Sequence, residues 1–216
     1  MLLNITLLLE RGKVVSFSSQ LTKERILECA TQEFLEKGFS DASIREIATR
    51  AKVTTGAIYN HFGSKDNLFN QIVKETADNL MELFIEMHEI SRKQNMMYSS
   101  KKRDVEKNFQ NTTGIILAYF YDNWVNIKLI FRCSKGSKYE TLCEEMIEIE
   151  EENTIAMISA QGIELDKTML FLIHVLSSAS MQQLIEVVSH DLTREEAFDY
   201  MMKIEKFYAG GIEKLL

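Results

Sequence analysis

Residues 22–70 read TKERILECATQEFLEKGFSDASIREIATRAKVTTGAIYNHFGSKDNLFN, and this stretch contains three short amphipathic helix patterns joined by tight turns. Thr22 is a favourable N-cap, so we expect the first helix to begin there and to end at Gly38, where glycine readily leaves the helical conformation. Its apolar positions recur at helical spacing and predict one buried face: Ile26, Cys29, Ala30 and Phe34.

The second helix is predicted to open with a capping box from Ser43 to Glu46, in which the serine and glutamate side chains each accept an amide hydrogen. After a turn at 51–53, the third helix is expected over 54–60 and begins with Thr-Thr-Gly. Small residues there let the helix backbone approach the edges of DNA bases. Two helices joined in this way form a helix–turn–helix, whose second helix lies in a DNA major groove.

Three segments in order, SIREIATRAKV, TTGAIYNHF and SKDNLF, closely resemble the N-terminal domain of TetR-family transcriptional regulators. The resemblance implies an all-α fold, with this three-helix domain followed by a helical domain for ligand binding and dimerisation. It implies phosphate contacts at Tyr59, His61 and Lys65 and places Arg45, Thr55 and Gly56 towards the bases or their flanking phosphates. The candidate DNA-binding residues are Ser43, Arg45, Thr54, Thr55, Gly56, Tyr59, Asn60, His61 and Lys65.

Several of these residues also have structural interpretations. Glycine lowers helix stability, and Gly56 is explained either by close approach to DNA or by a tight helix crossing. His61 is alternatively a helix-end residue with a local bond, and Tyr59 is alternatively packed partly in the core. Ile58 and Phe62 are expected to face the three-helix core.

The charge of the chain is unevenly distributed. The net charge is −7, yet Ser43 to Lys65 contains four cations and one anion, for a net charge of +3. The cations are Arg45, Arg50, Lys52 and Lys65. Acidic residues gather instead at 144–152, a predicted solvated helix face, with Leu142, Met146 and Ile149 turned inward. A positive patch on an acidic protein fits contact with DNA at one end only, although the glutamates of the first helix offset its own cations.

The absence of proline and the presence of only 9 glycines favour helix nearly throughout the 216 residues. We predict three parts: residues 1–21 as an N-terminal arm or mis-assigned start, 22–66 as the DNA-binding domain, and 67–216 as the effector-binding and dimerisation domain. Beyond a long helix from Ser64 to about Lys93 and a loop at 94–104, helices are expected at about 105–121, 123–133, 138–160, 166–190 and 193–214. Asp166 and Thr193 are the expected caps of the last two.

Aromatic residues are concentrated in 109–131, and the chain has 11 methionines, which adapt to varied apolar shapes. This pattern predicts either a ligand cavity or an ordinary core. Because no basic cluster occurs there, the expected effector is neutral or largely apolar. The candidate pocket residues are Thr112, Tyr119, Phe120, Asn123, Trp124, Asn153 and His174.

The last two predicted helices carry extensive apolar faces. The resemblance implies that they pair with a second copy as a four-helix bundle, so that a homodimer reads the two half-sites of a pseudo-palindromic operator. The alternative is that these faces form only the core of the monomer. The candidate dimer residues are Leu176, Ser180, Leu184, Met201, Ile204 and Tyr208.

Other classes of protein are disfavoured. Cys29, Cys133 and Cys143 form no CxxC pair, as expected of a reduced cytoplasmic protein, and no apolar run reaches the roughly 18 residues of a membrane helix. No metal-ligand spacing, phosphate loop or catalytic set occurs, so we expect no metal, no cofactor and no enzyme. The sequence predicts a DNA-binding transcriptional regulator, as a ligand-responsive repressor or, alternatively, as a nucleoid or protein-interaction factor without an effector.

Overall fold

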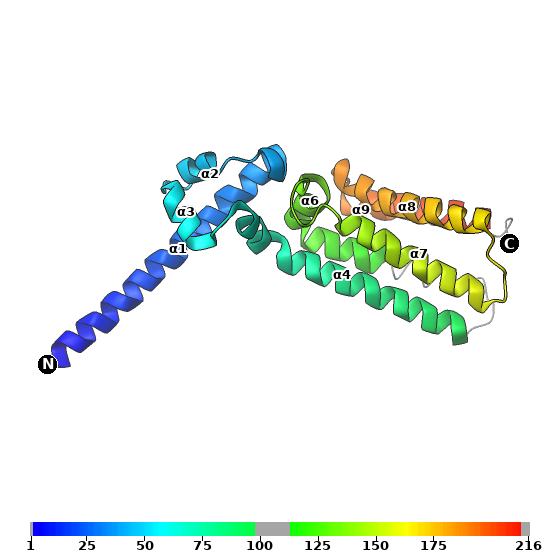
Figure 1. Ribbon diagram of the computed structural model, residues 1–216, viewed down its shortest axis with the longest axis horizontal. Helices are drawn as coiled ribbons and strands as arrows, with labels where there is room; N and C mark the ends of the chain where they lie inside the picture. The colour runs from blue at the N-terminus through cyan, green and yellow to red at the C-terminus, as the bar shows by residue number, and fades with distance from the viewer. Residues whose placement is uncertain (1, 98–112, 213–216) are drawn as a thin grey trace. The chain divides into compact units, whose positions relative to one another are not determined.

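The computed structural model describes residues 2–97 and 113–212, and every regular element in these two ranges is an α-helix (Figure 1). The predicted all-α class is confirmed. The helices that carry labels are α1 (Leu2–Asp41), α2 (Ile44–Arg50), α3 (Thr55–Phe62), α4 (Lys65–Met97), α6 (Trp124–Cys133), α7 (Leu142–Ala160), α8 (Lys167–Ser189) and α9 (Arg194–Ile212). A further helix covers 113–122.

Contacts divide the chain into two compact units. The first comprises Met1–Lys74 together with Cys133–Lys138, and the second comprises Glu75–Arg132 and Tyr139–Leu216. The division falls inside α4, eight residues beyond the domain limit expected from the sequence at 66. The segment Cys133–Lys138 was expected to belong to the C-terminal domain, but its contacts are with the first unit.

Helix α1 is longer than predicted. It begins at Leu2, so the expected start at Thr22 is wrong, and residues 2–21 continue the same helix. A threonine is tolerated inside a helix, and the chain has no proline to interrupt one. Gly38 does leave the helical conformation as expected, with φ 75° and ψ 166°, and the chain turns there before Asp41.

The first unit is held by a small aromatic core. Phe34 of α1 meets Phe69 of α4 edge to face, with ring centroids 4.9 Å apart, and Phe39 meets the same ring at 5.2 Å. Edge-to-face pairs of this kind add about 0.5–1.5 kcal/mol each beyond the burial of their surface. Ile58 and Phe62 are buried, which confirms their predicted inward orientation. Other buried side chains of this unit are Ile26, Ala30, Ile47 and Leu68.

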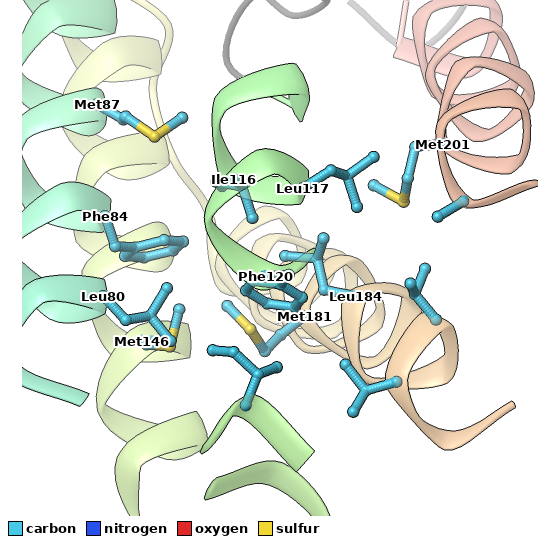
Figure 2. Close-up of a cluster of buried hydrophobic side chains, with 14 residues drawn as sticks. Leu80, Phe84, Met87, Ile116, Leu117, Phe120, Met146, Met181, Leu184 and Met201 are labelled. Atoms are coloured by element: carbon cyan, nitrogen blue, oxygen red, sulfur yellow. The ribbon is translucent and has the colours of Figure 1, made fainter. Parts of the chain in front are cut away.

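The second unit has a larger core around Phe120, whose side chain is fully buried. Side chains of α4, the helix over 113–122, α7, α8 and α9 meet there (Figure 2). Four methionines take part, as expected of a flexible side chain that fills irregular spaces: Met87, Met146, Met181 and Met201. Leu142 and Met146 of α7 are buried as predicted, and Ile149 packs partly buried against the cluster.

The helix ends of the second unit agree closely with the sequence prediction. A carboxylate oxygen of Asp166 accepts the Met169 amide hydrogen at 2.7 Å and caps α8. Thr193 and Glu196 form the predicted reciprocal box at the start of α9, with bonds of 2.8 and 3.3 Å. Helix α7 begins at Leu142 rather than 138 because 138–141 form turns.

Two further boundaries involve the residues left undescribed. Helix α4 continues through Met97, so the expected loop cannot begin at 94, and 98–104 lie outside the described residues. The predicted helix at 105–121 is helical where it is described, from 113 onward.

Candidate nucleic-acid interface

The turn between α2 and α3 is tight. Lys52 adopts φ 53°, a left-handed conformation that a non-glycine residue seldom occupies. The amide of Val53 donates to the Ala48 carbonyl at 3.0 Å, and Ala51 is fully buried beneath the turn. These contacts place α3 directly against α2, as a helix–turn–helix requires.

The starts of the two short helices agree only in part with the sequence prediction. The Ser43 hydroxyl accepts from the Glu46 amide at 3.5 Å, but the Ser43 amide donates to Glu33 of α1, at 3.1 Å, rather than to Glu46. The reciprocal half of the predicted capping box is therefore wrong. Thr54 is the N-cap of α3, with its hydroxyl accepting from the Ala57 amide at 3.1 Å, so the helix runs Thr55–Phe62 rather than 54–60.

Most candidate DNA-binding side chains reach solvent. Arg45, Thr54, Gly56, Tyr59 and Asn60 are exposed, and Ser43, Thr55, His61 and Lys65 are half-buried. A Cβ atom added to Gly56 would meet only the Thr54 hydroxyl oxygen, at 3.7 Å. Because no described residue crowds this position, the interpretation of Gly56 as a tight helix crossing is wrong for this fold.

Two of the four cations expected at the interface are engaged inside the first unit. The Arg50 guanidinium makes a two-pronged pair with Glu36, with N–O distances of 3.0 and 2.7 Å. This pairing lowers the pKa of the Glu36 carboxyl and raises that of Arg50. Arg45 and Lys52 are exposed and form no ion pair with a described residue. The positive patch is therefore smaller than the sequence count suggests.

Lys65 has a structural role that the sequence did not predict. Its ammonium donates to the carbonyls of Ser40 and Ala42, each at 3.0 Å, and lies 4.8 Å from the centre of the Phe39 ring. An ammonium has three N–H groups, so at most one remains for another acceptor. The phosphate contact expected for Lys65 stays a prediction, and within the first unit this side chain ties the start of α4 to the chain after Gly38.

The candidate pocket residues lie in different surroundings. Phe120 belongs to the core, and the Tyr119 hydroxyl donates to the Thr76 carbonyl at 2.9 Å. His174 is exposed and contacts Glu151 at 2.6 Å. Thr112 lies outside the described residues. For Phe120, the ordinary-core interpretation is confirmed and the pocket interpretation is wrong.

The remaining polar candidates are dispersed. Asn123 and Trp124 lie in a shallow open hollow of about 370 Å³ formed by residues 121–126. The Asn153 side-chain amide donates to the sulfur of Met157 at 3.5 Å, and its carbonyl oxygen is buried with no hydrogen-bond partner in the described part of the chain. A second open hollow of about 470 Å³ is lined by residues the sequence did not suggest: Gly114, Leu117, Arg194, Glu195 and Phe198.

The candidate dimer residues divide into two groups. Leu184 and Met201 are buried in the core of the second unit, so the assignment of these two side chains to a dimer interface is wrong. Leu176, Ser180 and Ile204 are half-buried, and the side chain of Tyr208 lies outside the described residues. Exposed apolar side chains that the sequence analysis missed also lie on α8 and α9: Leu170, Phe171, Val175, Phe198 and Phe207.

Helix α8 is more apolar than expected. An 18-residue window in it has a mean hydropathy of 1.3, and only 22% of that window is buried. By length and composition alone it could cross a membrane, a test that the core helix of a soluble protein also passes. One face packs on the core through Ile173, Met181 and Val187, while Phe171 and Val175 are exposed. An apolar face left open in this way is typical of a helix that meets a partner.

Comparisons with known proteins agree with this geometry. The family model of the tetR family of bacterial regulatory proteins matches residues 26–72, which span α2, α3 and the adjoining parts of α1 and α4. The transcriptional regulator AcrR of Shigella flexneri is 43% identical over 68 residues, covering 32% of this chain and 32% of AcrR. The transcriptional repressor BepR of Brucella suis is 48% identical over 52 residues, covering 24% of this chain and 25% of BepR. These matches therefore span about a third or less of each relative.

Solved structures match over most of the chain. A transcriptional regulator of the TerR/AcrR family from Aquifex aeolicus has a TM-score of 0.55 at 23% identity, covering 87% of this chain and 99% of the other. A γ-butyrolactone receptor, described as ArpA-like, has a TM-score of 0.54 at 15% identity and covers 87% of each chain. NalD, the secondary repressor of the MexAB-OprM efflux pump in Pseudomonas aeruginosa, has a TM-score of 0.51 at 18% identity, covering 86% of this chain and 94% of NalD. At such identities the likeness shows a shared fold.

Proposed function

This chain belongs to the TetR family of bacterial regulatory proteins, and from that premise we propose that it is a ligand-responsive repressor that binds a pseudo-palindromic operator as a homodimer. The family comprises transcriptional regulators rather than enzymes, as the sequence led us to expect. A cytoplasmic location, where the chromosome of a bacterium lies, is part of this proposal.

One observation carries the DNA-binding part of the proposal. Helix α3 presents an uncrowded N-terminal turn, with Thr55 and Gly56, and an exposed Tyr59 one turn later. A threonine offers a hydroxyl for a phosphate or base and a methyl for thymine, and tyrosine donates to a phosphate oxygen. The absence of a side chain at Gly56 allows the helix backbone to come close to the duplex.

The dimeric part rests on the second unit. Leu170, Phe171 and Val175 place exposed apolar surface along α8, and Phe207 of α9 is 74% exposed. A single helix–turn–helix reads few base pairs, whereas two related by a two-fold axis read half-sites about 34–36 Å apart. Covering these side chains with the same helices of a second copy would supply that symmetry.

A small-molecule effector would have an open hollow of the second unit as its binding site. The open hollow beside Leu117 and Phe198 is large enough for a small molecule and mostly apolar, with Arg194 and Glu195 at its edge. The hollow beside Leu117 and Phe198 and the hollow at 121–126 are both open to solvent, which favours a second candidate function: a DNA-binding nucleoid or protein-interaction factor that responds to no small molecule.

Selection of the purified protein against random duplex DNA at near-physiological salt tests the proposal. We expect enrichment of one inverted repeat with half-sites about one helical turn apart. Salt-sensitive binding without an enriched sequence would favour the nucleoid or interaction factor, and no binding at all would contradict both. The enriched duplex is then the probe for a screen of neutral and apolar compounds that release it.

A further inference from the structure

Helix α1 contributes a carboxylate to the interior of the first unit. The side chain of Glu33 is 0% exposed, one residue before Phe34 of the aromatic core. Burial of an ionised carboxylate is costly unless opposite charges and hydrogen-bond donors surround it. An apolar side chain of similar size would serve the core at least as well, so the presence of Glu33 calls for a specific role.

The contacts of Glu33 lead to both ends of α2. One carboxylate oxygen, Oε1, accepts the amide hydrogen of Ser43 at 3.1 Å and lies 3.0 Å from the ammonium of Lys37. The other, Oε2, lies 3.3 Å from a guanidinium nitrogen of Arg50 without forming a hydrogen bond. Ser43 is the N-cap of α2 and Arg50 is its last residue, so a single side chain of α1 reaches both ends of this helix.

The carboxyl of Glu33 is ionised at neutral pH. Burial raises its pKa, but hydrogen bonds from Lys37 and the Ser43 amide, with the charges of Lys37 and Arg50, outweigh this effect and hold the pKa below its ordinary value. Glu33 therefore acts on α2 as a negative charge as well as an acceptor.

We infer that Glu33 is a positioning residue for DNA binding, which fixes the orientation of α2 and, through it, of α3. This inference rests on the proposed function. Helix α2 has only seven residues, of which Ile47 and Ala48 are buried, so core packing holds it at few points. It packs against both α1 and α3. A rotation of α2 would therefore change the angle at which Thr55 and Gly56 meet the groove.

Glu36 provides a matched control on the same helix. It also pairs with Arg50, but its side chain is 53% exposed and it is not the acceptor for Ser43. Glu33→Gln and Glu36→Gln each remove one negative charge from α1. Electrostatics alone predicts that either change strengthens binding to the DNA polyanion, whereas a positioning role predicts that Glu33→Gln weakens it.

The experiment measures the affinity of the full-length protein for the selected operator and for an unrelated duplex, at a temperature where circular dichroism shows each variant to be folded. A variant that is merely less stable loses both affinities in the same proportion, because only its folded fraction falls. A variant in which α3 is misplaced loses affinity for the operator but keeps its affinity for the unrelated duplex. We expect Glu33→Gln to weaken operator binding by about tenfold, with unrelated DNA changed by less than about threefold. Glu36→Gln should keep the wild-type ratio of operator affinity to unrelated-duplex affinity.

A second variant, Glu33→Leu, tests the role of Glu33 independently of Glu33→Gln. Glu33→Leu removes both the charge and the acceptor for Ser43, so we expect a larger loss of specificity than in Glu33→Gln and faster hydrogen exchange of the Ser43 amide by NMR. The inference would be overturned if Glu33→Gln left the ratio of operator affinity to unrelated-duplex affinity unchanged. It would also be overturned if a folded Glu33→Leu left the exchange rate of the Ser43 amide unchanged. Neither result would contradict the proposed function. Failure of the wild-type protein to select any sequence would instead overturn the proposed function, and the inference with it.

Discussion

The hydroxyl of Ser40 donates a hydrogen bond of 2.7 Å to the main-chain carbonyl of Lys135, 95 residues further along the chain. The carbonyl of Ser40 in turn accepts from Lys65 at the start of α4. Lys135 lies in the segment Cys133–Lys138, which contacts the first unit although the helices on either side of it, α6 and α7, lie mainly in the second. The chain therefore passes between the units at this segment as well as within α4.

Gly136 tests the importance of this contact. It adopts φ +85°, and a Cβ atom there would lie 2.5 Å from the Ser40 hydroxyl oxygen. Gly136→Ala should lower the free energy of unfolding by about 2–3 kcal/mol, because it combines left-handed strain with a displaced hydrogen bond. Thermal and urea unfolding measure the change.

Gly162→Ala is the control for Gly136→Ala. Gly162 has φ +76° but no described residue within 4 Å of a Cβ atom, so its substitution should cost only the strain of the left-handed backbone, about 1–2 kcal/mol. Ser40→Ala combined with Gly136→Ala should cost less than the two single changes added together. Equal losses at Gly136 and Gly162 would show that the Ser40 contact contributes nothing.

The exposed and paired arginines of α2 should differ in their effect on DNA binding. Arg45 is exposed without an ion pair to a described residue, whereas Arg50 is held by Glu36 and Glu33. Arg45→Gln should reduce the slope of log affinity against log salt by about one if it neutralises a phosphate. Arg50→Gln should leave the slope unchanged while lowering stability. A slope that falls only in Arg50→Gln would contradict this assignment of the interface.

His88 should make the stability of the second unit depend on pH near neutrality. Its ring nitrogens face two acceptors, the Phe84 carbonyl at 2.8 Å and the Glu150 carboxylate at 2.5 Å. Burial lowers the pKa of His88, but the hydrogen bond and charge of Glu150, with the Phe84 carbonyl, outweigh burial and Arg92 and raise the pKa above 6.5. The protonated form is thus preferred in the folded state.

A raised pKa in the folded state stabilises the protein below the unfolded value of 6.5, and this contribution is lost as pH rises through the folded pKa. We expect the urea midpoint of the wild-type protein to fall over that range. His88→Phe should be less stable than the wild-type protein at low pH, and its urea midpoint should change less with pH. His190→Phe, at an exposed site, should keep the pH dependence of the wild-type midpoint. A wild-type midpoint that rose with pH would contradict the role of His88.

Much of the fold was predictable because its signals are local. Caps such as Asp166 and Thr193 act over three residues, and the apolar spacing of Ile58 and Phe62 places them inward. The start of α1 was not predictable in the same way, because Thr22 is compatible both with a cap and with the interior of a helix.

What the sequence did not predict at the candidate site has a tertiary cause. Arg50 and Lys65 were counted as cations for DNA, but partners 14 to 25 residues away occupy them. Glu33 offered a signal that was missed: it lies seven residues after Ile26 and three after Ala30, on the apolar face of α1. Aromatic and methionine content could not separate a cavity from a core, and Phe120 proved to be core.

The exposed face of α8 should control dimerisation. Phe171 is 66% exposed and Val175, one turn further, is 44% exposed. If a second copy covers them, Phe171→Ser and Val175→Ser together should weaken the dimer by at least about a hundredfold, since burying each side chain contributes about 1.5–3 kcal/mol. Sedimentation velocity measures the dissociation constant. Val125→Ser removes an equally exposed apolar side chain from α6 and should leave it unchanged. Loss of the dimer in Val125→Ser, with the α8 variant unaffected, would place the interface on another face of the second unit.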